Sequence, residues 1–248
     1  MILSRRRFLG LAAAAAFSGP VLAAPDSEGR GRVSAKALQA GQWAMVIDSR
    51  RFSQAALREA VIAACHSFHN VPQLPAPRRL DWLEQHSFAE TFPGLAPDFL
   101  PDGLRERIFL TLCNHCRNPP CVRVCPTGAS FCRGDGIVGV DVHRCIGCRY
   151  CMAACPFGAR GFNFEDHRLA GANPAYPQRT RGVVEKCTFC AERLAEGRRP
   201  LCVEASDGAI AFGDLADPAS SVRVLLAENF TLRRKPWLGT EPGVYYIL

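Results

Sequence analysis

Two tight groups of cysteines in the middle of the chain constrain its fold more than any other feature. The first group reads Cys113-Asn-His-Cys116-Arg-Asn-Pro-Pro-Cys121-Val-Arg-Val-Cys125-Pro126, and the second reads Cys145-Ile-Gly-Cys148-Arg-Tyr-Cys151-Met-Ala-Ala-Cys155-Pro156. The second group follows the pattern C-x2-C-x2-C-x3-C-P, and the first is the same pattern with two extra residues before its third cysteine. Spacings this short and this regular indicate thiols that share bound metal rather than thiols scattered through a core.

This pattern is the one by which bacterial ferredoxins hold two [4Fe–4S] clusters. Three cysteines of each run face one cluster, and the fourth, before the proline, ligates the other cluster. Crossed ligation therefore predicts two clusters here. We call the first ligand set site 1 and the second site 2: Cys113, Cys116, Cys121 and Cys155 form site 1, and Cys125, Cys145, Cys148 and Cys151 form site 2.

The cysteines could in principle serve three other uses. Structural zinc uses C-x2-C pairs but does not need triplets that end in Cys-Pro. Disulfides suit an oxidising compartment, although cysteines two residues apart in a looped run are poor partners. A c-type haem needs C-x-x-C-H, and no C-x-x-C pair here is followed by histidine. Zinc and disulfides remain alternatives at this point, whereas haem attachment is excluded.

A third group supplies only three thiols. Cys187 and Cys190 form a C-x-x-C pair, and Cys202 follows after eleven intervening residues, but Ser206 stands where a further cysteine would complete the run. Cys65 is isolated about fifty residues before the others, at the end of a helix predicted over 54–65 with Ser53 as its N-cap. From the residues alone, Cys65 is either a small buried side chain or the missing ligand.

Together the groups resemble the four-cluster ferredoxin-type subunits of polysulfide, dimethyl sulfoxide, tetrathionate and nitrite reductases, over residues 42–248. The resemblance is greatest to the periplasmic iron–sulfur subunits of Dsr-type membrane complexes of sulfur metabolism. It rests on residues 65–72, 113–121, 184–193, 212–218, 233–239 and 245–247. It implies an α+β fold of duplicated bacterial ferredoxin-like modules, one inserted in the other, with long Pro/Gly-rich loops.

The resemblance also gives Cys65 a role. In this family the N-terminal run ends at the position of Cys65, which implies a third cluster on Cys65, Cys187, Cys190 and Cys202, called site 3. The other three positions of that run fall within 52–58, which has no cysteine, and their distant partner is Ser206. The resemblance thus implies three [4Fe–4S] clusters and a fourth site lost as a whole. Cys132 lies outside every cysteine run and is expected to be a free thiol.

The expected organisation follows from these assignments. Residues 42–70 plus 183–213 form the outer module, and residues 107–165 form the inserted module. Residues 71–106, which contain six prolines, are expected to be a loop or arm, and residues 214–248 a C-terminal extension. Local patterns predict strands over 43–48, 108–112 and 209–212, a hairpin around 133–136 and a helix over 222–229.

The first residues have the character of a targeting segment. Ser4-Arg5-Arg6-Arg7-Phe8-Leu9 precedes an Ala-rich apolar run, which predicts a twin-arginine signal peptide over 1–24 and a periplasmic protein peripherally associated with the inner membrane. A Sec signal or a short membrane anchor is the alternative. The apolar run, residues 11–17, is too short to span a bilayer.

The remaining composition excludes several functions. A net charge of +7, three of it from residues 5–7, is too weak to indicate nucleic-acid binding. No nucleophilic triad, phosphate loop or carboxylate pair is visible, so we expect no small-molecule substrate of its own. Arginines and histidines beside the cysteines are expected to tune or support the clusters rather than ligate them: Arg117, Arg144, Arg149, His66, His69, His115 and His143.

The expected function is electron transfer. The resemblance implies a polytopic membrane quinone-interacting subunit as partner and, for the Dsr type, a multihaem cytochrome c. Two rival functions stay open. One is the iron–sulfur subunit of a molybdopterin oxidoreductase, and the other is a structural metal-binding protein.

Overall fold

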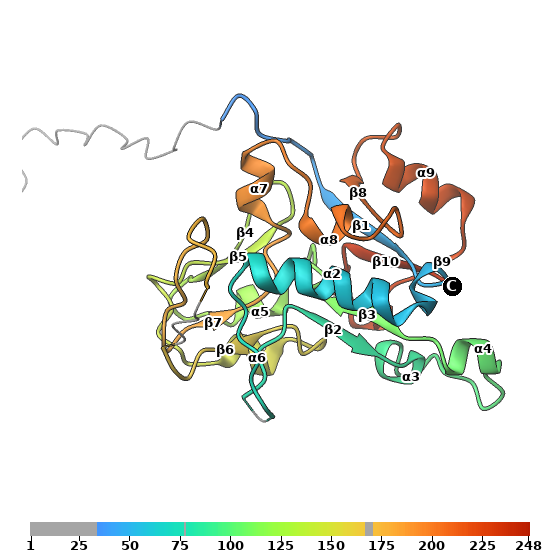
Figure 1. Cartoon of the computed structure of the whole chain (residues 1–248), viewed down its shortest axis with the longest axis horizontal. Helices are drawn as coiled ribbons and strands as arrows, with labels where there is room; N and C mark the ends of the chain where they lie inside the picture. Colours follow the sequence, from blue (N-terminus) through green and yellow to red (C-terminus); the bar gives the residue numbers. More distant parts are fainter. Residues whose placement is uncertain (1–33, 77, 167–170) are drawn as a thin grey trace, which may run out of the picture. The chain divides into compact units, whose positions relative to one another are not determined.

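The main sheet of this computed structural model has four strands in the order β8-β1-β10-β9 (Figure 1). Its central strand β1 (Trp43–Asp48) pairs antiparallel with β8 (Ile210–Asp214) and parallel with β10 (Val244–Ile247). The short strand β9 (Thr231–Leu232) pairs with β10. β1 is apolar from end to end except for its last residue, as expected of a strand covered on both faces. The strands predicted over 43–48 and 209–212 are confirmed.

The structure describes residues 34–76, 78–166 and 171–248, and Ala35–Leu248 form one compact unit. The predicted signal peptide over 1–24 lies outside the described residues. Within the described part of the chain, no helix has the length and apolar character needed to cross a bilayer.

The two faces of β1 are buried against different partners. Ala44 and Val46 pack against Val222 of helix α9 (Ser221–Glu228). The alternate residues Met45 and Ile47 face the large core that contains the buried cysteines. This alternation follows from the two-residue period of a strand. The helix predicted over 222–229 is therefore confirmed, and it covers the sheet on the face away from the cysteines.

The helix predicted over 54–65 is α2 (Ala55–Phe68), and it buries Val61 and Cys65. The prediction of Ser53 as its N-cap is wrong, because Gln54 is the capping residue and makes no side-chain capping bond. Ser53 ends the preceding 3-10 turn η1 (Arg51–Ser53), one residue too early to cap the first turn of α2.

Residues 71–106 are not the plain loop or arm that the prolines suggested. They contain β2 (Leu83–His86), α3 (Phe88–Thr91) and α4 (Asp102–Arg105). β2 pairs antiparallel with β3 (Phe109–Leu112), which matches the strand predicted over 108–112. This segment also buries several large side chains in the main core, namely Leu80, Trp82, Leu83, Phe88 and Phe92.

The hydrophobic effect explains the difference from the expected loop. The apolar residues of this segment lie in short elements or in the turns beside them, where no helical or strand period repeats long enough to be recognised. A capping box fixes the start of α3, because the Ser87 side chain accepts from the Glu90 backbone N–H and the Glu90 side chain bonds back to the Ser87 backbone.

The cysteine-rich middle of the chain is built from short elements. They are α5 (Pro120–Arg123), β4 (Ser130–Cys132), β5 (Val138–Val140), α6 (Tyr150–Ala154) and β6 (Gly161–Phe162). β4 and β5 form the predicted hairpin, with Gly136 in its turn at φ 84°. β6 pairs with β7 (Val184–Glu185), so this pairing joins the middle segment to the last cysteine group.

Three further elements complete the fold. α7 (Ala191–Ala195) and α8 (Leu201–Glu204) carry the end of the last cysteine group, and α8 packs against α2. The 3-10 turn η2 (Pro236–Leu238) precedes β10 near the C-terminus.

Candidate iron–sulfur centres

The four cysteines predicted for site 1 lie around one narrow cavity, whose walls also include Phe157 and Arg160. Cys113 follows the end of β3, Cys121 lies in α5 and Cys155 directly follows α6. Burial raises the pKa of Cys116 to about 12 and raises the pKa of Cys121 and Cys155, and the neighbouring thiols raise them further. Metal binding is what holds such crowded thiols as thiolates.

The four cysteines predicted for site 2 line a second cavity, together with Ser130 and Arg149. Cys125 stands out because its pKa is lowered, although burial opposes this, through hydrogen bonds that include one from the Ser130 backbone N–H at 3.4 Å. Cys148 is exposed, whereas Cys151 is buried. Among the three sets, site 2 is thus the one with a fully exposed cysteine.

The structure also brings Cys65 to the other three cysteines of site 3. All four thiols are buried, and burial raises the pKa of each. After burial, the largest influences that raise the pKa of Cys65 are the charges of Cys187, Cys202 and Cys190. Cys65 comes from α2, Cys187 and Cys190 from the loop between β7 and α7, and Cys202 from α8.

The first C-x-x-C loops of the three cysteine groups share one backbone feature. The residue before the second cysteine of each loop has a positive φ, namely 41° at His115, 69° at Gly147 and 55° at Phe189. This conformation is strained for any residue except glycine, so it persists only where the surrounding fold requires it. Its recurrence shows that the three loops turn in the same way.

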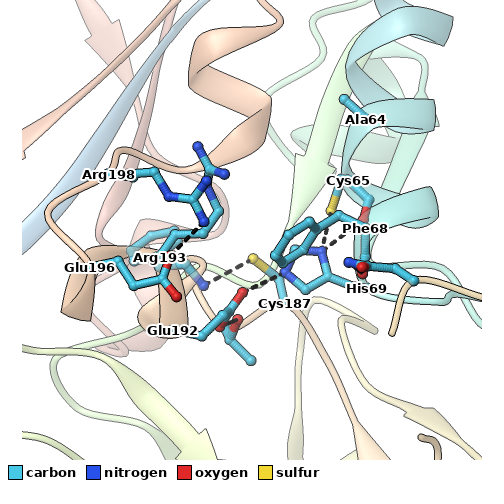
Figure 2. A network of polar contacts seen from close by, with 12 residues as sticks. Ala64, Cys65, Phe68, His69, Cys187, Glu192, Arg193, Glu196 and Arg198 are labelled. Carbon is cyan, nitrogen blue, oxygen red and sulfur yellow. Dashed lines mark hydrogen bonds and ion pairs between the residues drawn. The ribbon is translucent and has the colours of Figure 1, made fainter. Parts of the chain in front are cut away.

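A buried histidine connects site 3 to a carboxylate. The Nδ1 of His69 lies 2.7 Å from the carbonyl oxygen of Cys65 and 3.6 Å from its Sγ, and Nε2 lies 2.8 Å from Glu192 (Figure 2). His69, Cys190 and Glu192 each offer one atom that could bind a metal ion, and these three atoms lie within 4.8 Å of one another. Because both ring nitrogens already face acceptors, His69 is placed to support the cysteines rather than to replace one.

The other flanking histidines differ in their surroundings. The Nε2 of His66 accepts the backbone N–H groups of Trp82 and Leu83, each at 3.2 Å. His143 is exposed. The Nε2 of His66 is thus occupied by backbone donors, whereas His143 is open to solvent.

Two buried cations beside the sites were missed by sequence reasoning. Arg160 is 5% exposed and donates from Nη2 to the Sγ of Cys121 at 3.0 Å. Lys186 is 3% exposed and donates to the backbone carbonyls of Val138 and, at 2.7 Å, Cys187. The expected tuning residues Arg117, Arg144 and Arg149 are all exposed. In the sequence, the only sign of a tuning cation is that it lies near a cysteine. This nearness does not reveal whether the side chain is buried.

The position of the expected lost ligand is closely packed. Ser206 is fully buried, and its Oγ donates to the Val203 carbonyl at 2.8 Å and accepts the Ile210 N–H at 3.0 Å. The neighbouring residue Asp207 accepts a hydrogen bond from Arg51 at its carbonyl, at 2.7 Å, so residues 51–58 begin beside this turn. Phe52 is also fully buried. A protein core therefore occupies this region.

The chemistry of these sites fits iron–sulfur clusters. Three sets of four thiols match the ligation of [4Fe–4S] clusters by four cysteines each, and all thirteen cysteines, each within the described residues, are free thiols in the structure. Cys132 is exposed and belongs to none of the sets. The fold and its sites define an iron–sulfur protein.

Comparison with known proteins identifies its family. Residues 105–215 match the family described as a 4Fe-4S dicluster domain. The chain is 40% identical, over 99% of its length and 98% of the relative, to the Hdr-like menaquinol oxidoreductase iron-sulfur subunit 1 of Archaeoglobus fulgidus. It is 35% identical, over 83% of its length and 88% of the relative, to the iron-sulfur cluster-binding subunit of the menaquinone reductase of Nitratidesulfovibrio vulgaris.

A third relative is the B subunit of the polysulfide reductase of Wolinella succinogenes, which is 42% identical over 61% of this protein and 73% of the relative. The protein belongs to the family of ferredoxin-type [4Fe–4S] electron-transfer subunits that its cysteine runs predicted. A cluster of this type, when bound, accepts and releases one electron. The protein's own residues supply the thiolates, the buried surroundings and the nearby charges.

Proposed function

We propose that this chain is a periplasmic electron-transfer subunit with three [4Fe–4S] clusters, held at sites 1, 2 and 3 as assigned above. The observation that carries this proposal is the gathering of twelve cysteines into three sets of four. The sets lining the first two cavities each combine three cysteines of one run with the last cysteine of the other. Crossed ligation of this kind belongs to proteins with two adjacent ferredoxin-type clusters.

We infer that site 1 lies between site 3 and site 2. Cys187 of site 3 and Cys113 of site 1 are close enough for the charge of Cys113 to raise the pKa of Cys187. On the other side, Arg160 contacts Cys121 of site 1 and influences Cys151 of site 2. The sites then run from the buried site 3 to site 2, whose Cys148 is exposed. This order suits a relay with one outlet at site 2.

The fourth cluster of related subunits has no place here in our proposal. Ser206 and Phe52 are fully buried where its ligands would lie, and no cysteine occurs within 52–58. A buried side-chain hydroxyl with both its hydrogen bonds made does not need a ligand. We propose that the packed core replaced the cluster, with the two ferredoxin-like modules otherwise arranged one within the other.

The proposed partner is a polytopic membrane quinone-interacting subunit. Two relatives named above carry menaquinol or menaquinone in their names, and the described part of this chain has no helix that crosses a membrane. The leader supports export by the twin-arginine route and association with the inner membrane. A Dsr-type complex with a multihaem cytochrome c and a sulfur-compound pathway is the specific form that we propose.

The experiment is purification of the tagged chain from the membranes of cells that produce it naturally, under anaerobic conditions. We expect a polytopic membrane protein and a c-type cytochrome to co-purify, and a menaquinol analogue to bleach the visible iron–sulfur absorption of the complex. The chain purified alone should bleach with dithionite but not with the quinol.

Two outcomes would replace this proposal. Co-purification of a molybdopterin protein in place of the cytochrome would favour the rival oxidoreductase, which the likeness to the polysulfide reductase subunit supports. Zinc without iron or visible absorption would make the chain a structural metal-binding protein, because Zn²⁺ has no redox chemistry.

Protease digestion of the chain in intact spheroplasts tests the periplasmic location, since only an exported chain is accessible there.

A further inference from the structure

Arg160 is a buried cation at the boundary between sites 1 and 2. Its side chain comes from the segment between Cys155 and β6 and is 5% exposed. Nη2 donates to the Sγ of Cys121 at 3.0 Å, and Nη1 donates to the Oγ of Ser130 at 3.0 Å. Cys121 belongs to site 1, whereas Ser130 lines the cavity of site 2. One guanidinium therefore reaches both sites.

Arg160 also influences a ligand of site 2. The thiol of Cys151, which is assigned to site 2, lies within hydrogen-bonding reach of the Arg160 side chain. Arg160 therefore faces cysteines assigned to two different sites.

No carboxylate compensates this charge within the described residues. None of the ion pairs found there includes Arg160: they involve other arginines and two histidines. A guanidinium stays protonated in proteins, and burying it without a counter-charge is strongly unfavourable. Clusters held by four thiolates are anions in both redox states, so they supply the missing counter-charge from two sides.

We propose that Arg160 is a positioning residue shared by sites 1 and 2, which raises the reduction potential of both clusters and weakens the repulsion between them when both are reduced. This inference rests on the proposed electron-transfer function. Each reduction adds one electron from an external reductant and breaks no bond. A fixed buried cation stabilises that added negative charge more than an exposed one, because little water screens it.

Arg149 offers a matched comparison within the same chain. It lines the cavity of site 2, but it is exposed and lies over the ring of Phe162 at 5.4 Å. Water and salt screen an exposed charge. Arg149 should therefore affect the potential of site 2 less than Arg160 does, although it directly follows the ligand Cys148.

The test is an EPR-monitored redox titration of the full mature chain with dithionite, for wild type, Arg160→Gln, Arg160→Lys and Arg149→Gln. Iron per chain is measured for each variant. We expect Arg160→Gln to keep its iron and to shift two of the midpoint potentials to more negative values, leaving the third in place. Arg160→Lys should keep both midpoint potentials close to their wild-type values. Arg149→Gln should shift the midpoint potential of site 2 by less than Arg160→Gln does. Unchanged midpoints in a fully loaded Arg160→Gln chain would overturn the inference.

If Arg160→Gln loses iron, its midpoint potentials cannot be compared with those of the wild type, and Arg160→Lys then tests the role of the charge. A fully loaded lysine variant with near-wild-type midpoints supports a role of the charge, whereas loss of iron from this variant too, or displaced midpoints, overturns that role. Failure of the proposed function is seen separately in the wild type. A wild-type chain without reducible clusters rejects the electron-transfer function itself, whereas three reducible clusters with a silent Arg160 reject only this inference.

Discussion

The rings of His115 and Phe189 stack with their centroids 3.7 Å apart and an angle of 17° between their planes. His115 lies in the C-x-x-C loop of site 1, and Phe189 lies in that of site 3. Both residues are buried, and both have a positive φ. The stack therefore connects the two cysteine loops directly and holds them in a defined relative position.

Replacement of Phe189 by leucine tests the strength of this connection. The variant keeps an apolar side chain at a position of φ 55°, so backbone strain is similar in both proteins. It loses the ring contact, for which we expect a cost of about 1 kcal/mol. The measurement is the thermal unfolding midpoint of the cluster-loaded chain. Phe131→Leu, at a ring that is 40% exposed, is the control and should unfold like the wild type; equal midpoints in all three proteins would contradict the role of the stack.

The packed region around Ser206 gives a second prediction. Ser206→Cys restores the one cysteine that the last group lacks, but no cysteine within 52–58 is available to share a cluster with it. We therefore expect the iron content per chain to stay at the wild-type value. The buried hydrogen bonds of Ser206 to Val203 and Ile210 are weakened in this variant, so a lower unfolding midpoint is also expected. A gain of about four iron atoms, one cubane, would show that a fourth site survives.

His66 predicts a pH dependence of stability. Burial lowers its pKa from the ordinary 6.5 to about 4, and its unprotonated Nε2 accepts two backbone N–H groups. Between about pH 4 and pH 6.5, His66 of the unfolded chain binds a proton that His66 of the folded chain does not. The contribution of His66 to stability is thus complete above pH 6.5 and falls as the pH drops toward 4.

The matched variant is His66→Gln, whose amide oxygen accepts the same N–H groups without titrating. We expect the thermal midpoint of the wild type to fall more between pH 7 and about pH 5 than the midpoint of the variant does. Parallel pH profiles would show that His66 does not titrate as its burial suggests.

The cysteine spacing in the sequence was enough to predict which thiols of sites 1 and 2 lie together in the structure, because this spacing follows from cluster geometry. Cys65 needed the family resemblance, since an isolated cysteine has no spacing to interpret. Short elements such as β2 and α3 were not predicted, because tertiary burial of residues such as Trp82 and Phe92 stabilises them and no local period does. Arg160 could not be separated from Arg149 in the sequence, since the fold alone decides which arginine is buried.

The most direct test of the three-cluster account is the amount of iron and acid-labile sulfide per chain in anaerobically purified wild type, Cys65→Ala and Cys132→Ala. We predict about twelve iron atoms in the wild type and in Cys132→Ala, and about eight in Cys65→Ala, because each lost cubane removes four. A wild type with about eight iron atoms, unchanged by Cys65→Ala, would contradict the account and make Cys65 an ordinary buried thiol.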